Sequence, residues 1–298
     1  MLQKRQSFTR NKQVVRDLQC ETVRKHMSEQ FGQLSYFGLP SSSLDDLAQW
    51  NAMIDRATAV ERGVSGREWI LQNELLVNAF RLGISQKLTL LRGDIDNVLV
   101  SGADDFGHKP SWPFDIVSLD YSGGIFYRSI EGVHTRLEAL RQLFQRQKEA
   151  GARLFVLFLS FKLDNLDQHE IRASIKSIKR DLRRSGHAAD KIIDRYLAHP
   201  QDQPRLKLYV LHLVNNLSVQ ANYDAESEPP IFYKGNRDIE MMAFRFFLKY
   251  SPKTFAPRLP KERLNQIVNR RMIEIRNGQQ ISTNLRIPLM KFATSNEH

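Results

Sequence analysis

The chain has 298 residues, of which 41% are hydrophobic and 26% are charged. It is therefore long enough to bury a substantial core, and its composition excludes a disordered or collagen-like chain. The single cysteine, Cys20, cannot form an internal disulfide or a thiolate metal site, so we expect no metal and a reducing compartment. No apolar run approaches the roughly 20 residues of a membrane span, and the first residues do not resemble a signal peptide. These features predict a cytoplasmic protein with no membrane partner.

The net charge of +11 is distributed unevenly along the chain. Residues 1–40, 164–205 and 249–298 together carry +13, and the rest of the chain carries −2. A nearly neutral core with basic flanks predicts surfaces for a polyanion, of which nucleic acid is the most plausible. A basic surface that serves solubility alone is the alternative.

Hydrophobic periodicity predicts strands that alternate with helices. In chain order, we expect a basic amphipathic helix over 8–33, a strand over 34–38, a helix near 43–54, a strand over 58–61, a helix near 66–82 and strands over 88–92 and 114–120. A helix over 133–149 and a strand over 153–161 come next, followed by a polar insertion at 164–205 that holds a basic helix over 171–185. The pattern ends with a helix over 207–223, a β-hairpin from 230–234 and 241–250, and a basic helix over 261–277.

This order predicts an α/β fold with a doubly wound, mostly parallel sheet that ends in an antiparallel β-hairpin. Helical additions are expected at the N-terminus, in the insertion and at the C-terminus. The predicted domains are a basic N-terminal helical extension at 1–33, a Rossmann-like domain at 34–250 that contains the insertion 164–205, and a basic C-terminal extension at 251–298.

Three segments at the ends of predicted strands carry a family resemblance. They are Ala59-Val60-Glu61-Arg62, the run RGDIDNVL at 92–99 and the run FDIVSLDY at 114–121. Their order resembles that of class I S-adenosylmethionine-dependent methyltransferases over residues 34–250. The resemblance implies S-adenosylmethionine as the cofactor, with Glu61 on the ribose hydroxyls, Asp94 on the adenine amino group and Ile95 against the adenine ring. The cofactor-binding residues that it implies are Gly38, Ser41, Glu61, Arg62, Asp94 and Ile95.

Each of these residues also has a structural interpretation. Glu61 can be an exposed strand terminus or a partner for Arg56 or Arg62, and Asp94 can cap the helical turn that follows it. Family members usually have an acid and then Gly-x-Gly after the first strand, whereas this chain has Tyr36-Phe37-Gly38-Leu39-Pro40. Residues Ser41–Ser43 can instead cap the next helix. Cofactor binding is therefore either altered or lost.

The segment Asp120-Tyr121-Ser122-Gly123-Gly124 follows the fourth predicted strand. It resembles the Asp-Pro-Pro-Tyr type of motif in methyltransferases that modify the amino nitrogens of bases. The resemblance implies that Asp120 orients the amine and that Tyr121 stacks on the base, as the catalytic residues. Because neither proline is present, a flexible turn is the alternative.

Two predicted basic helices are the candidates for contact with nucleic-acid phosphates. Solvated faces or a protein partner are the alternative for them. The function that these features favour is an S-adenosylmethionine-dependent methyltransferase acting on nucleic acid, at a base amino group. The alternatives are an inactive methyltransferase-like module that binds nucleic acid or a protein partner in a mobile-element or defence assembly, and a methyltransferase for a small molecule or protein. The predicted nucleic-acid-binding residues are Arg172, Lys176, Lys179, Arg180, Arg183, Arg184, Arg270 and Arg271.

Overall fold

The structure is a computed structural model that describes residues 9–62, 68–127, 135–164, 166–184, 190–199, 202–252 and 261–283. Its α-helices are α1 (Arg10–Met27), α2 (Asp45–Trp50), α3 (Glu68–Arg81), α4 (Ile95–Ser101), α5 (Arg136–Glu149), α6 (Gln168–Arg184), α7 (Asp190–Ala198), α8 (Asp202–Gln220) and α9 (Lys261–Asn269). Its strands are β1 (Leu34–Gly38), β2 (Ile54–Glu61), β3 (Leu88–Arg92), β4 (Ile116–Asp120), β5 (Leu154–Lys162), β6 (Tyr223–Ser227), β7 (Ile231–Lys234), β8 (Glu240–Tyr250), β9 (Met272–Arg276) and β10 (Gln279–Thr283).

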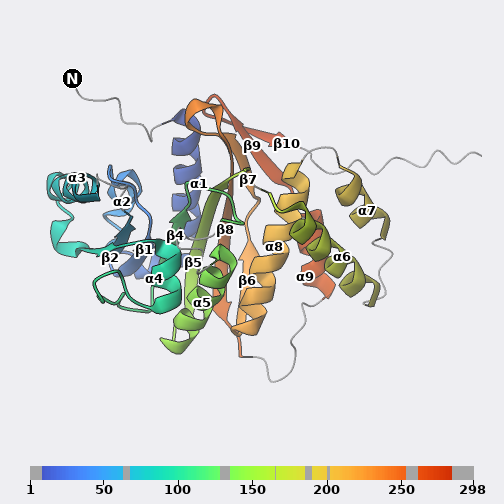
Figure 1. Cartoon of the computed structure of the whole chain (residues 1–298), viewed down its shortest axis with the longest axis horizontal. Helices are drawn as coiled ribbons and strands as arrows, with labels where there is room; N and C mark the ends of the chain where they lie inside the picture. The colour runs from blue at the N-terminus through green and yellow to red at the C-terminus, as the bar shows by residue number, and fades with distance from the viewer. Residues whose placement is uncertain are drawn as a thin grey trace, which may run out of the picture.

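The described strands form a single sheet in the order β10-β9-β7-β8-β5-β4-β1-β2-β3 (Figure 1). Strands β1 to β5 are parallel, and β8 runs antiparallel to β5. Both β6 and β7 pair with β8 in the antiparallel sense, along different halves of its length. They therefore point in the same direction as β1 to β5. The carboxyl ends of β1 to β5 consequently meet at one edge, which is where ligands bind in doubly wound folds.

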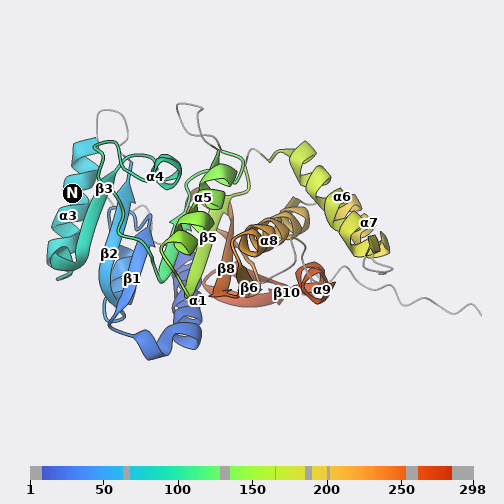
Figure 2. The same ribbon diagram turned by 90° about the horizontal axis from the view of Figure 1, so that it is seen from below.

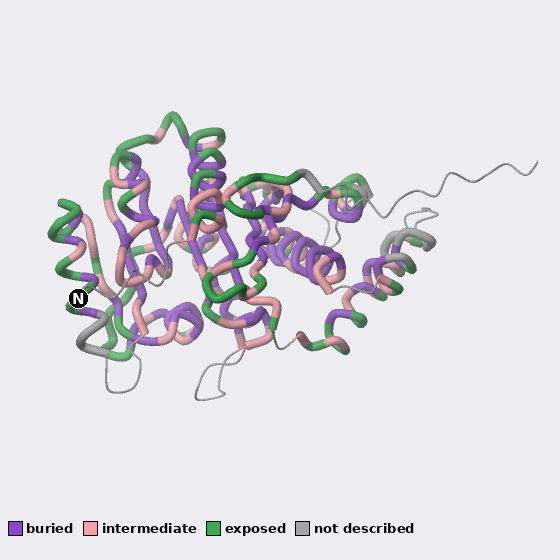
Figure 3. The backbone as a smooth tube through the Cα atoms, turned by 90° about the horizontal axis from the view of Figure 1, so that it is seen from above, coloured by how far each residue is buried: buried purple, intermediate pink, exposed green. Residues whose placement is uncertain are grey.

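Helices cover both faces of this sheet (Figure 2). On one face, α4, α5 and α8 bury aliphatic and aromatic side chains of the central strands, and α6 and α9 join the same core. On the other face, α1, α2 and α3 pack on β1, β2, β4 and β5, and α1 continues over β7, β8 and β9. Figure 3 shows the buried residues concentrated in the sheet and its neighbouring helices, with exposed residues along the outer helices. Among the described helices, none is both long and apolar enough to cross a bilayer.

Local sequence explains how several of these helices begin. Thr9 caps α1 by accepting a hydrogen bond from the Lys12 amide at 3.1 Å, and Thr135 caps α5 by accepting one from the Glu138 amide at 3.2 Å. Helix α2 differs, because its N-cap is Leu44 in the left-handed region, with no side-chain hydrogen bond. The alternative in which Ser41–Ser43 cap this helix is therefore wrong.

The predicted α/β fold with a mostly parallel sheet and a closing antiparallel pair is confirmed. Three local predictions are wrong. Residues 54–57 belong to β2 rather than to a helix or loop, Tyr223 opens the strand β6, and the basic helix expected over 261–277 ends at Asn269. After Asn269, β9 and β10 form a hairpin, and β9 pairs in parallel with β7. The start of the helices predicted from residues 66 and 133 lies outside the described residues.

Candidate active site at the carboxyl ends of the strands

The carboxyl ends of β2 and β3 bring two predicted cofactor ligands together. Glu61 lies opposite Arg92 in the register of the two strands, and the Gly93 amide donates a hydrogen bond to the Glu61 carbonyl at 3.2 Å. Asp94 follows directly and begins α4. The structure therefore places Glu61 and Asp94 at the carboxyl ends of two neighbouring strands, on the same rim of the sheet.

Glu61 is partly buried at the end of β2. Burial alone raises the pKa of its carboxyl to about 7. Within the part of the chain that the structure describes, this carboxylate has no hydrogen bond and no ion pair with a side chain. An acceptor of this kind, desolvated and unpaired, is suited to a ligand that donates hydrogen bonds, such as a vicinal diol.

Asp94 is already engaged by two groups. Its Oδ1 accepts a hydrogen bond from the Asp96 amide at 2.8 Å, which confirms the capping interpretation, and its Oδ2 lies 3.3 Å from Nη1 of Arg62. The same Arg62 nitrogen donates to the Tyr127 hydroxyl at 3.3 Å.

Ile95 is 4% exposed and packs in the core. The ring-packing role expected of Ile95 finds no support in this position.

The loop after β1 is shaped by close backbone contacts. A Cβ at Gly38 would lie 2.0 Å from the Ser118 carbonyl oxygen, so only glycine fits between β1 and β4. Ser41 has φ 60° and its hydroxyl lies 3.0 Å from that of Ser43, which donates to Asp45 at 2.8 Å. The close approach of β1 and β4 therefore requires glycine at position 38. The Ser41 hydroxyl takes part in a local hydrogen-bond network with Ser43 and Asp45.

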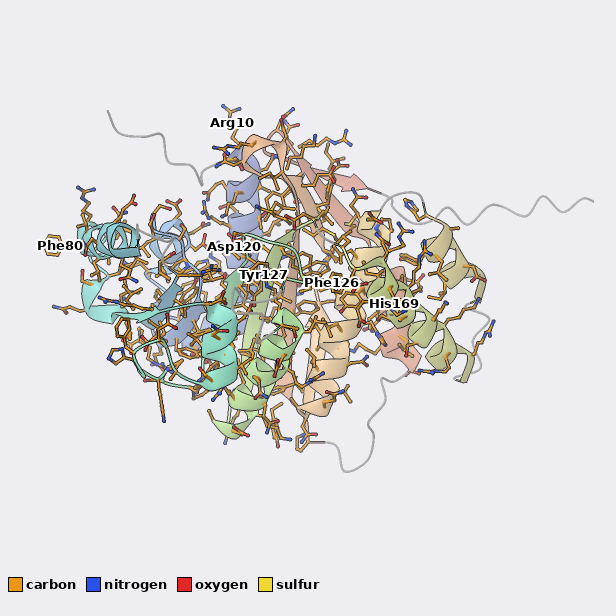
Figure 4. All side chains as sticks on the ribbon, viewed as in Figure 1. Arg10, Phe80, Asp120, Phe126, Tyr127 and His169 are labelled. Atoms are coloured by element: carbon orange, nitrogen blue, oxygen red, sulfur yellow. The ribbon has the colours of Figure 1, made fainter. Side chains whose placement is uncertain are left out.

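Asp120, at the end of β4, is held by a cation from the N-terminal helix. Nζ of Lys12 lies 2.6 Å from its Oδ2, and the two side chains are 23% and 17% exposed. The charge of Asp120 is the largest cause of the raised pKa of Lys12. Figure 4 shows Asp120 near the middle of the molecule beside α1, far from Phe80 on α3. The predicted catalytic carboxylate thus belongs to an ion pair beneath α1.

This ion pair is part of a buried charge layer, by which we mean Lys12 and Arg16 of α1, Asp46 of α2 and Asp120. Nε of Arg16 donates to Asp46, and burial raises the pKa of the Asp46 carboxyl despite both cations. The site residues predicted from the sequence do not include Lys12, Arg16 and Asp46. The sequence signal for the two cations is their spacing of four residues, which places them on one helix face.

The Tyr36 hydroxyl is buried against this layer. It has no hydrogen-bond partner of acceptable geometry among the described residues. Burial and then the charge of Asp46 raise the pKa of Tyr36. Tyr36 stands two residues before Gly38, where the resemblance implies an acid. A neutral phenol therefore stands where the family has a carboxylate.

Tyr121 points to the opposite face of the sheet. Its side chain is 2% exposed, its hydroxyl donates to Asp96 at 3.0 Å, and the Arg136 guanidinium lies 3.7 Å from its ring centroid. Nε of Arg136 also contacts Asp96, at 3.3 Å. The ring is enclosed between these groups and the core, so it offers no free surface to a base. The stacking role expected of Tyr121 finds no support in this geometry.

The residues at this edge fit only part of S-adenosylmethionine. Glu61 suits the ribose, but the adenine side is spanned by the Arg62–Asp94 contact. On the methionine side, Tyr36 replaces the acid, Pro40 replaces the second glycine, and Lys12 covers Asp120. The space between α1, Asp46 and Asp120 holds only about 10 Å³. The whole cofactor therefore does not fit the described arrangement.

The predicted nucleic-acid-binding residues of α6 divide into two groups. Ile171, Ile175 and Ile178 of this helix are buried. The opposite side carries the α6 basic face, which consists of the exposed residues Arg172, Lys176, Arg180 and Arg183. Spacings of three and four residues align these four cations along one side of the helix.

The other predicted cations are placed differently. Lys179 is 20% exposed and lies 2.6 Å from Asp194 of α7. The side chain of Arg184 lies outside the described residues. Arg270 is partly buried between α9 and β9, and burial lowers its pKa, whereas Arg271 is exposed. Arg270 and Arg271 therefore lie after the end of α9, contrary to the helix predicted over 261–277.

The chain matches no protein-family model, and a search of curated proteins finds no match. Among solved structures, it is similar to a precorrin-6y C5,15-methyltransferase from Geobacter metallireducens, at 11% identity and a TM-score of 0.38, covering 80% of this chain and 87% of that one. It is also similar to a putative RNA methyltransferase from Pyrococcus horikoshii, at 9% identity and a TM-score of 0.42, covering 81% and 84%. An O-methyltransferase from Bacillus cereus is similar at 8% identity and a TM-score of 0.41, covering 82% and 83%. These likenesses assign no ligand to this chain.

The Glu61 carboxyl provides a pH-dependent test of this site. Its raised pKa means that the folded chain binds this proton more tightly than the unfolded chain does. Stability should therefore fall as the pH rises from about 4.5 to about 7. Glu61→Gln mimics the neutral form, so it should stabilise the protein by about 1–3 kcal/mol at pH 8 and by little at pH 4.5. Urea unfolding at both pH values measures the difference. Glu74→Gln, at an exposed position of α3, is the control, and an equal effect of Glu61→Gln at both pH values would contradict the assignment.

The sheet itself shows the fold. Five parallel strands with crossover helices are followed by an antiparallel pair, as expected from the motifs at 59–62, 92–99 and 114–121. The chain therefore has a Rossmann-like α/β fold, with a mostly parallel sheet that continues into antiparallel strands.

Proposed function

We propose that this chain is a methyltransferase-like module that binds nucleic acid and does not transfer methyl groups. The observation that carries the proposal is the Lys12–Asp120 ion pair at the end of β4. A carboxylate that orients an exocyclic amine must have a free oxygen facing the acceptor. Here the ammonium of Lys12 lies against that carboxylate, and α1 covers it.

Releasing Asp120 would have a substantial energetic cost. Both side chains of the pair are largely buried, and a buried charge that loses its partner typically costs about 3–5 kcal/mol. Movement of α1 would also expose Arg16 and Asp46, which are 2% and 5% exposed. The closed arrangement is therefore the ground state of the protein under this proposal, and the second motif residue, Tyr121, is enclosed on the other face.

The nucleic-acid part of the proposal rests on the α6 basic face. Arg172, Lys176, Arg180 and Arg183 lie along about three turns of one helix, and the buried isoleucines on its other side fix their orientation. Such a row matches the regular spacing of phosphates along a nucleic-acid strand. Because the contacts would be to the backbone, the binding would depend on salt more than on sequence.

A second candidate function is an active methyltransferase on nucleic acid. The specific observation in its favour is Glu61, whose desolvated carboxylate lacks a side-chain partner among the described residues and lies next to Asp94. That candidate requires S-adenosylmethionine to bind at this rim and α1 to leave Asp120.

Cofactor binding separates the two candidates. The full chain should show no transfer of labelled methyl groups from S-adenosylmethionine to RNA or DNA, and Glu61→Gln should leave its nucleic-acid affinity unchanged. Calorimetry at millimolar S-adenosylmethionine, with and without nucleic acid, measures cofactor binding. A filter-binding assay measures methyl transfer. Methyl incorporation that is lost in both Glu61→Gln and Asp120→Asn would contradict the proposal and establish the second candidate.

The α6 basic face provides a test of nucleic-acid binding. Replacing Arg172, Lys176 and Arg180 together by Gln should weaken binding to a single-stranded oligonucleotide by at least about tenfold at low salt. It should also reduce the slope of log K against log salt by roughly 2–3, because about one counterion is released for each phosphate contact. Fluorescence anisotropy across a salt series measures both quantities.

The control variant removes the same charge elsewhere. It replaces Arg81, Arg141 and Lys249, which are exposed on α3, α5 and β8, by Gln. We expect this triple variant to lower affinity only slightly. Equal losses in the two triple variants would show that net charge, rather than the α6 basic face, accounts for binding.

A further inference from the structure

The last turn of α1 meets the end of β6 at a cluster of three side chains with metal-ligating atoms. His26 comes from α1, Glu226 from β6 and Glu228 from the segment just after β6. One ligand atom from each of the three lies within 4.8 Å of those of the other two. The cluster lies on the sheet face that α1 covers and is separate from the rim that holds Glu61 and Asp120.

His26 supplies the observation that points to a ligand. Its side chain is only 10% exposed, and its ring stacks on Phe247 with 4.2 Å between ring centroids. Its Nε2 is buried and has no hydrogen-bond partner among the described residues. The nearest carboxylate oxygen, Oε1 of Glu228, lies 3.7 Å away, which is too long for a hydrogen bond. Two ligands of one tetrahedral zinc ion lie about 3.4 Å apart, given metal–ligand bonds of about 2.0–2.1 Å.

Two carboxylates face His26, and the cations Lys25 and Arg245 lie near Glu228. Nζ of Lys25 lies 2.8 Å from Glu228 and 4.0 Å from Glu226. The cluster also lies at the carboxyl end of α1, where the helix dipole is negative. The Lys25 side chain is 56% exposed, so it can swing into solvent and leave both carboxylates to another cation.

We propose that His26, Glu226 and Glu228 form a binding site for a divalent transition-metal ion of the zinc type. One imidazole nitrogen and two carboxylates suit zinc, whereas Mg²⁺ and Ca²⁺ prefer oxygen ligands alone. The ion would complete the coordination of His26 Nε2 and tie the end of α1 to β6. The site is independent of the proposed function, although it would strengthen the attachment of the helix that carries Lys12.

Zinc binding to the metal-free full-length chain tests the site. Calorimetric titration with ZnCl₂ should show one tight ion per chain with a micromolar dissociation constant. Saturating zinc should raise the melting temperature by several degrees, because the ion binds the folded state. Millimolar Mg²⁺ or Ca²⁺ should not compete with it.

Variants locate the ion. Glu226→Gln changes a side chain that is 54% exposed, so it should preserve the fold and weaken zinc binding at least about tenfold; His26→Gln should do the same. Lys25→Gln should tighten binding severalfold, because it removes the competing ammonium. His169→Gln, at an exposed position of α6, is the control and should have no effect.

Four outcomes would overturn the site. The first three are the absence of zinc binding at millimolar concentration, equal affinities for wild type and Glu226→Gln, and equally tight binding of Mg²⁺. Weaker zinc binding in Lys25→Gln would also contradict the proposal, because it would show that Lys25 supports the cluster rather than competing for it.

Discussion

The ion pair between Lys12 and Asp120 is the constraint on which the interpretation of this protein depends. It joins the first turn of α1 to the end of the fourth strand, next to the buried pair of Arg16 and Asp46. Charges this deeply buried are tolerated only when they are paired, so α1 and the sheet edge hold each other in place. The carboxyl end of β4 is thereby covered by α1.

The two sides of the rim differ in whether their carboxylates are paired with cations of the chain. At the ends of β2 and β3, Glu61 is desolvated and has no side-chain partner among the described residues, which leaves it available to a ligand. On the other side, Asp46 of α2 and Asp120 at the end of β4 are paired with Arg16 and Lys12 of α1. On the first side a carboxylate can accept hydrogen bonds from a ligand, whereas on the other side both carboxylates are already paired. This asymmetry separates the motif residues: Glu61 is open to a ligand, whereas Asp120 is engaged by Lys12.

Much of the fold could be predicted from the sequence, because buried parallel strands have continuous apolar runs. The run at 153–161 is the clearest case and forms the central strand β5. The region after Asn269, predicted to be helical from its basic residues, forms strands instead. Met272, Ile273 and Ile275 are buried strand residues, and Asn277-Gly278, with φ of 52° and 78°, is a typical hairpin turn. That signal was in the sequence.

The site was less predictable for two separate reasons. Side chains of consecutive strand residues point to opposite faces, so Asp120 and Tyr121 could have been separated by this rule alone. The partner of Asp120, by contrast, lies over a hundred residues earlier in the chain, and no local pattern indicates it. The capping role of Asp94 was foreseen, whereas its contact with Arg62 depends on how two loops meet.

The most direct measurement is a double-mutant cycle on the free energy of unfolding, with Lys12→Met, Asp120→Asn and the double variant. If the pair holds α1 on the sheet edge, each single variant should lose about 2–4 kcal/mol, and the double variant should lose less than the sum by at least about 1.5 kcal/mol. Effects that add to within about 0.5 kcal/mol would show that the two side chains do not interact, and would contradict the closed site.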